Sequence, residues 1–208
     1  MEDEFLIDGP SDASHTLVLA HGAGAPMDSS FMNRMSVGLS ERGIRVVRFE
    51  FPYMTKRRVE GKRGAPDREP VLKARWIEVV DRFGGGARLL VGGKSMGGRI
   101  ASMVADEIGA RGLVCLGYPF HPPADPTRLR TKHLETLATP TLIVQGTRDA
   151  FGSREEVAGY RLSPAIRVVW IEGGDHSWKP PARSGRTEAD NLREAISAVG
   201  DFVLGLPS

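Results

Sequence analysis

The chain has 208 residues and carries 28 Lys and Arg against 26 Asp and Glu, which gives a formal net charge of +2. A charge this close to zero argues for neither a nucleic acid nor a membrane partner. Hydrophobic residues at 40% and charged residues at 26% are typical of a globular protein and exclude fibrous and disordered classes. We expect a single domain over residues 1–208, in an oligomeric state that the sequence leaves open.

The N-terminus and the single cysteine indicate the compartment. Residues 1–4 are acidic and lack the basic and apolar regions of a signal peptide, and no run of about 18 apolar residues occurs. We therefore expect a cytoplasmic protein. Cys115 lies in an apolar run, where we expect a buried, inert thiol.

Strand-like and helix-like runs alternate along the chain. Predicted strands cover residues 5–8, 16–20, 45–51, 87–92, 112–117, 141–146 and 166–172. Predicted helices cover residues 29–42, 71–83, 97–108, 127–136, 154–161 and 188–204. This alternation is typical of an α/β fold, so we expect a mostly parallel, twisted sheet of about seven strands with helices on both faces.

Residues 54–68 stand apart because they are basic, interrupted by Gly and Pro, and without periodicity. We expect a basic loop or lid there, following the predicted strand 45–51 at the carboxyl edge of the sheet. Two interpretations remain open: a solvated loop, or a lid whose positive field attracts substrates that carry a carboxylate or phosphate. Its basic residues are Lys56, Arg57, Arg58, Lys62, Arg63 and Arg68.

The strongest motif is the G-x-S-x-G sequence over residues 93–97, with Ser95 at its centre. An apolar strand-like run precedes it and a helix-compatible run follows it. A strand-turn-helix of this kind holds its serine in a strained conformation above the sheet, and it needs small residues two positions before and after. Gly93 and Gly97 meet that requirement, so Ser95 is the predicted nucleophile.

A serine hydroxyl needs a base to take its proton and an acid to orient that base. In this type of fold the chain order is Ser, acid, His, each after the carboxyl end of a strand. Asp149 follows the predicted strand 141–146 and His176 follows strand 166–172, so we predict Asp149 as the acid and His176 as the base. Asp125 and Asp175 remain alternative acids.

The tetrahedral oxyanion of acyl transfer needs main-chain donors. The N–H of Met96, which opens the helix after the nucleophile, is one predicted donor. The second is expected in the glycine-rich loop after strand 16–20, from Ala23 or Gly24, with Ala23 preferred. His21 is expected to anchor that loop. Possible pocket-lining residues are His21, Gly24 and His121.

Four segments, 21–24, 93–98, 146–149 and 174–176, together resemble the α/β-hydrolase superfamily over nearly the whole chain. The chain is most similar to its compact dienelactone-hydrolase-like group of serine hydrolases. It differs from dienelactone hydrolases proper, which use a cysteine where this chain has Ser95. No insert large enough for a cap domain separates the strand after Ser95 from the strand before Asp149. The resemblance implies an α/β-hydrolase fold without a separate cap.

We therefore predict a serine hydrolase that cleaves small or medium carboxylic esters or thioesters through an acyl-enzyme intermediate. No metal is expected, because no Cys, His and Asp cluster has the spacing of zinc ligands. No organic cofactor is expected either, because the glycine-rich turn lacks the dinucleotide and phosphate-loop patterns. The alternative is a non-catalytic scaffold of the same fold. It is disfavoured because every catalytic position is filled.

Overall fold

The computed structural model describes residues 4–61 and 64–207, and its centre is a seven-stranded sheet. The strand order is β1-β3-β2-β4-β5-β6-β7. Only β1 runs antiparallel to its neighbour, β3, and all other neighbours are parallel. The predicted α/β fold with a mostly parallel sheet is confirmed. The strands are β1 (Phe5–Asp8), β2 (Thr16–Ala20), β3 (Arg45–Phe49), β4 (Leu89–Lys94), β5 (Gly112–Leu116), β6 (Thr141–Gly146) and β7 (Ile166–Ile171).

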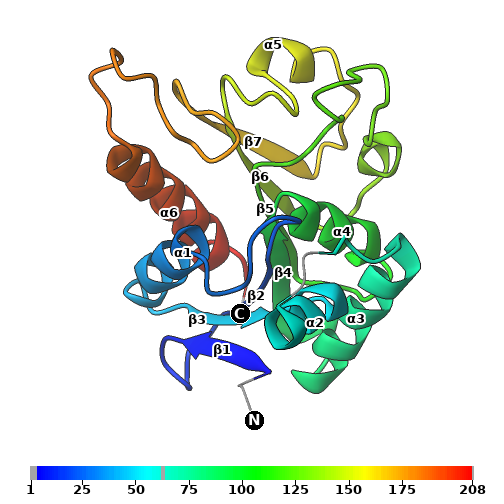
Figure 1. Cartoon of the computed structure of the whole chain (residues 1–208). Helices are drawn as coiled ribbons and strands as arrows, with labels where there is room; N and C mark the ends of the chain where they lie inside the picture. The colour runs from blue at the N-terminus through cyan, green and yellow to red at the C-terminus, as the bar shows by residue number, and fades with distance from the viewer. Residues whose placement is uncertain (1–3, 62–63, 208) are drawn as a thin grey trace.

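Helices cover both faces of the sheet (Figure 1). One face carries α1 (Ser30–Ser40) and α6 (Glu188–Leu204), which also pack against each other. The other face carries α2 (Pro52–Glu60), α3 (Glu69–Arg82) and α4 (Met96–Val104). Shorter elements complete the chain: α5 (Arg154–Val157) and two 3₁₀ turns, Gly86–Arg88 and Lys132–Glu135. Within residues 4–61 and 64–207, no separate cap domain lies over the sheet.

Two apolar cores lie on the two faces because successive side chains of a strand point in opposite directions. On β2, Val18 packs toward α3 and α4, whereas Leu17 and Leu19 pack toward α1 and α6. The inner strands β4, β5 and β6 are buried almost throughout, as expected of parallel strands covered on both sides. Cys115 belongs to this buried core, as predicted.

The basic segment 54–68 differs from the expected loop because its first part is helical. Pro52 takes a first-turn position of α2, where a proline needs no N–H partner. The carboxylate of Asp67 accepts the N–H of Tyr53 at 2.8 Å and so satisfies a free donor at the helix start. Residues 54–60 therefore belong to α2, residues 64–68 are irregular, and Lys62 and Arg63 lie outside the described residues.

The predicted helix 127–136 is also wrong, because only the 3₁₀ turn Lys132–Glu135 forms there. The carboxylate of Asp125 accepts hydrogen bonds from the N–H and the hydroxyl of Thr127, at 3.2 and 2.6 Å. An aspartate that bonds to the chain two residues further on stabilises a turn and competes with a helix.

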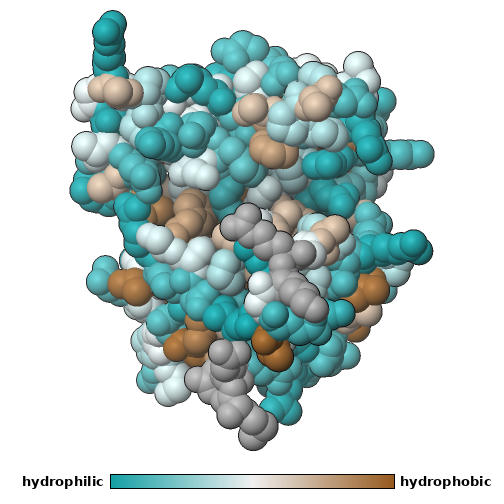
Figure 2. All heavy atoms as spheres, viewed as in Figure 1, coloured by the Kyte–Doolittle hydropathy of each residue, from teal (hydrophilic) through white to brown (hydrophobic). Residues whose placement is uncertain are grey.

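The surface seen in Figure 2 is mostly hydrophilic, with apolar residues scattered over it. Among the described residues, no helix combines the length and the apolar character needed to cross a bilayer.

Parallel strands all end at one edge of the sheet, and this edge collects the segments that carry the predicted site. Ser95 follows β4, Asp149 follows β6 and His176 follows β7.

Candidate active site

Ser95 sits at the sharp turn between β4 and α4 with φ 51° and ψ −115°. A non-glycine residue rarely adopts a positive φ, so the turn is strained. The close approach of the turn to β2 explains its glycines. A Cβ atom on Gly93 would lie 2.3 Å from the carbonyl oxygen of Ala20, and one on Gly97 would lie 2.5 Å from the same oxygen. The sequence motif thus forms the expected strand-turn-helix, which we call the nucleophile elbow.

Three side chains from separate loops form one hydrogen-bonded series at this edge. His176 Nε2 lies 2.9 Å from Ser95 Oγ, and His176 Nδ1 lies 2.8 Å from Asp149 Oδ2. The structure therefore brings together Ser95, His176 and Asp149 as the sequence predicted.

The carboxylate of Asp149 is fully buried but well supplied with donors. Gln145 Nε2 donates to its Oδ2 at 2.9 Å, and the N–H of Phe151 donates to its Oδ1 at 2.8 Å. Donors of this kind stabilise the ionised form of a buried carboxyl. Gln145 was not predicted from the sequence, although a polar side chain after the apolar residues 142–144 of β6 was a usable signal.

The surroundings of the His176 imidazole favour its neutral form. Burial lowers its pKa below the ordinary value of 6.5, and the nearby cation of Lys94 lowers it further, while the hydrogen bond to Asp149 raises it. The hydrogen-bond pattern assigns the proton to Nδ1, which donates to Asp149 and leaves the Nε2 lone pair facing Ser95. An imidazole in this state can accept the serine proton.

The two alternative acids have other contacts. Asp125 is exposed and bonds to Thr127. Asp175 Oδ1 accepts the N–H groups of Ser177 and Lys179, at 2.8 and 2.9 Å, and so stabilises the turn after His176. The carboxylate hydrogen-bonded to His176 is that of Asp149.

Lys94, the residue before Ser95, also contacts the candidate site. Its ammonium donates to the main-chain oxygen of His176 at 2.6 Å and lies 5.5 Å from the centre of the Phe31 ring. A Cβ on Gly117 would lie 2.9 Å from Lys94 Nζ, so glycine leaves room for the ammonium. Burial lowers the pKa of Lys94 to about 8, although the carboxylates of Asp149 and Asp175 act to raise it. The sequence did not predict this contact.

The predicted oxyanion loop lies beside the serine. A Cβ on Gly22 would be 3.7 Å from Ser95 Cβ. Ala23 and Gly24 are exposed, so their main chain is accessible. Met96 is the first residue of α4, and its N–H has no partner within the helix. Both predicted donor segments therefore border Ser95.

Neither histidine expected to line a pocket does so. His21 is fully buried; Nδ1 donates to Gly22 O at 2.7 Å and Nε2 accepts the N–H of Phe51 at 3.1 Å. Both ring nitrogens are therefore engaged, and burial lowers the pKa of this ring. His21 anchors the loop, as expected. His121 is 1% exposed, with Nδ1 bonded to Pro122 O at 3.0 Å.

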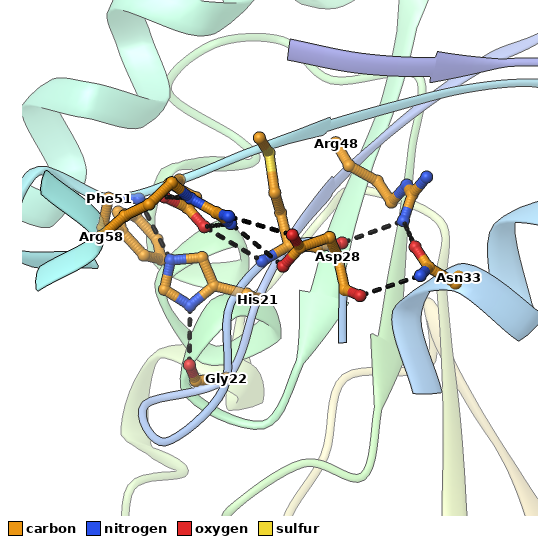
Figure 3. Close-up of polar contacts among 9 residues, drawn as sticks. His21, Gly22, Asp28, Asn33, Arg48, Phe51 and Arg58 are labelled. Carbon is orange, nitrogen blue, oxygen red and sulfur yellow. Dashed lines mark hydrogen bonds and ion pairs between the residues drawn. The ribbon is translucent and has the colours of Figure 1, made fainter. Parts of the chain in front are cut away.

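The basic side chain of Arg58 on α2 is committed to internal ion pairs (Figure 3). It bonds to both carboxylate oxygens of Asp28 at 3.0 Å and approaches Glu50 Oε1 to 2.6 Å. These contacts connect α2 with the end of the loop that begins at His21. Figure 3 also shows Arg48 bonded to Asn33 on the far side of this loop. Because the charge of Arg58 is paired, Arg58 adds little to any positive field of the segment 54–68. That this segment acts as a lid stays a prediction.

Over residues 4–61 and 64–207, no group of three or more His, Cys, Asp or Glu side chains is arranged to hold a metal ion. The chemistry available at this edge is that of a serine, an imidazole, a buried carboxylate and main-chain donors.

A mostly parallel sheet of this order, with a serine on a strained strand-to-helix turn, is typical of α/β hydrolases. A family model described as an alpha/beta hydrolase domain matches residues 13–204, so the chain belongs to this family and is a hydrolase.

Solved structures agree on the fold. An α/β serine hydrolase homologue from Coxiella burnetii is 22% identical, with a TM-score of 0.69 over 98% of this chain and 91% of the other. Dienelactone hydrolase from Anabaena variabilis is 18% identical, with a TM-score of 0.72 over 98% and 92%. An α/β serine hydrolase without lid from Xanthomonas campestris is 20% identical, with a TM-score of 0.68 over 98% and 89%.

Proposed function

We propose that this hydrolase is a serine esterase or thioesterase that cleaves small or medium carboxylic esters or thioesters through an acyl-enzyme intermediate. The observation that carries the proposal is the position of His176, whose ring nitrogens lie 2.9 Å from Ser95 Oγ and 2.8 Å from Asp149 Oδ2. This arrangement satisfies the geometric requirement for nucleophile, base and orienting acid.

In the acylation step, Ser95 Oγ attacks the carbonyl carbon of the ester while its proton passes to His176 Nε2. Asp149 stabilises the imidazolium through Nδ1–H, and it can do so because its own carboxylate is held by Gln145 and the N–H of Phe151. The carbonyl oxygen becomes an oxyanion, for which we propose the N–H groups of Met96 and Ala23 as donors. The amino terminus of α4 adds its partial positive charge at the same place.

When the tetrahedral intermediate collapses, the bond to the leaving oxygen or sulfur breaks and His176 Nε2–H protonates the leaving group. A water molecule then attacks the acyl-enzyme, giving its proton to His176. The carboxylic acid leaves and Ser95 regains its proton. The low pKa of His176 suits both halves of this cycle, because the ring must begin each half neutral.

Ser95 is half-buried and Ala23 and Gly24 are exposed, so an ester can approach Ser95 from solvent. The name of the Anabaena variabilis protein indicates a lactone, which is a cyclic ester, as the substrate of that protein. This chain has Ser95 where dienelactone hydrolases proper use a cysteine, so we do not extend the lactone to it and propose carboxylic esters or thioesters in general.

A fluorophosphonate probe tests the proposal directly, because it reacts covalently with an activated serine. Wild-type protein should be labelled, and Ser95→Ala and His176→Gln should not. A panel of 4-nitrophenyl esters and matched thioesters of increasing acyl length would then define the substrate. A folded wild-type protein that neither reacts with the probe nor hydrolyses any ester would refute the proposed activity and favour the scaffold alternative.

A further inference from the structure

The phenol of Tyr53 lies against the loop that carries the proposed oxyanion donors. Its hydroxyl lies 3.0 Å from the carbonyl oxygen of Ala23 and 3.4 Å from that of Gly22. His21 Nδ1 donates to the same Gly22 oxygen at 2.7 Å. Two consecutive carbonyl groups of the loop are thus held from one side.

Holding these carbonyls fixes the direction of the next N–H groups. A trans peptide unit is planar, and its C=O and N–H point in opposite directions; the described chain has no cis peptide bond. The N–H of Ala23 belongs to the peptide unit of the Gly22 carbonyl, and the N–H of Gly24 to that of the Ala23 carbonyl. Both N–H groups therefore point away from Tyr53.

Residues 23–25 need such support because they make few packing contacts of their own. Ala23, Gly24 and Ala25 are exposed, and a Cβ on Gly24 would meet no atom within 4 Å. A segment with few packing contacts samples many peptide orientations unless hydrogen bonds restrict it. An oxyanion hole works because its donors are oriented before the charge develops, so a rotating peptide would weaken it.

Tyr53 itself is rigidly placed. Its ring is 7% exposed and packs edge-on against His21, with ring centres 5.7 Å apart. Its N–H is held by Asp67 at the start of α2. Burial raises the pKa of Tyr53, so its hydroxyl remains a proton donor at every pH at which the enzyme would work. The His21 ring is held in turn by the N–H of Phe51, which donates to its Nε2 (Figure 3).

From these contacts we infer that Tyr53 is a positioning residue for the oxyanion hole. Its hydroxyl holds the Gly22 and Ala23 carbonyls so that the N–H of Ala23 faces the oxyanion formed at Ser95. This role rests on the proposed serine hydrolase activity. It assigns to the first turn of α2 a function unrelated to charge.

The test compares Tyr53→Phe, which removes only the hydroxyl, with a matched control. Tyr118→Phe also removes a buried hydroxyl that donates to a main-chain oxygen, that of Arg130 at 3.0 Å, but Tyr118 does not contact the oxyanion loop. Both variants are compared at equal concentrations of folded protein, determined from their thermal unfolding.

For a 4-nitrophenyl ester, we expect Tyr53→Phe to lower kcat about 10-fold with KM within about 2-fold, since a displaced donor weakens only the interaction made in the transition state. An alkyl trifluoromethyl ketone adds Ser95 Oγ to its carbonyl carbon and becomes an oxyanion. Its affinity should fall by the same factor as kcat. Tyr118→Phe should change neither quantity, although it lowers the melting temperature.

If Tyr53→Phe does not fold, Asp67→Ala provides a second variant, because it releases the main chain of Tyr53 but keeps the hydroxyl. It should lower kcat in the same direction, by a smaller factor. The inference is overturned if a folded Tyr53→Phe enzyme keeps wild-type kcat, or if Tyr118→Phe loses as much. Wild-type protein that is inert to a fluorophosphonate would instead refute the proposed function, and the inference with it.

Discussion

The ammonium of Lys94 lies 2.6 Å from the main-chain oxygen of His176, although the residues are 82 positions apart. The contact crosses from β4 to the loop after β7, and it places a cation close to the imidazole. Its proximity makes protonation of His176 less favourable, in addition to the effect of burial.

This relationship predicts the pH dependence of activity. The acid limb of kcat/KM reports the pKa of the free base, so it should lie below pH 6.5 in the wild-type enzyme. Lys94→Met removes the cation, so the pKa of His176 should rise and the acid limb should move to higher pH. The measurement is the pH profile of kcat/KM for a neutral ester, with the exposed Lys56→Met as control. An unmoved acid limb would show that Lys94 has no electrostatic effect on the base.

Ser95→Ala should remove ester hydrolysis, with a loss of up to about 10⁶-fold in kcat if acylation limits turnover. The fold should remain, because the substitution removes only the hydroxyl group and the turn depends on its glycines. Activity and circular dichroism on the same sample check this. A purified variant that keeps a tenth of wild-type activity would rule out Ser95 as the nucleophile.

Asp149→Asn should lower kcat on the order of 10⁴-fold, because the amide favours the wrong imidazole tautomer. Asp125→Asn is the control, since Asp125 contacts only its own turn, and it should retain nearly full activity. Steady-state kinetics of the two variants compare them directly. The reverse ranking would transfer the role of acid to the loop after β5.

Arg58→Gln should lower the free energy of unfolding by about 2 kcal/mol, because it leaves Glu50, which is 4% exposed, without its cation. The value is below that of a fully buried pair because the Arg58 side chain is 27% exposed. Urea unfolding measures it. Lys56→Gln, on the same helix and 71% exposed, should change stability by less than about 0.5 kcal/mol. Equal effects of the two substitutions would contradict a structural role for the Arg58 ion pairs.

The sequence alone determined the strands and the elbow, because these depend on local patterns. Continuous apolar runs predicted the buried strands, and two glycines around Ser95 predicted a turn that only small residues allow. The chain order of Ser95, Asp149 and His176 sufficed to predict their meeting, since parallel strands end at one edge of the sheet.

Only the tertiary structure decided which residues surround Ser95, His176 and Asp149. Lys94, Gln145 and Tyr53 contact partners brought close only by the strand order and by the packing of α2 against the loop after β2. Local periodicity does not encode such distances. The same limit explains why residues 54–60 are helical and not the expected loop, since the carboxylate of Asp67 accepts the N–H of Tyr53 from 14 positions away. It also explains His21, which is buried by the rings of Phe51 and Tyr53 rather than placed on a pocket wall.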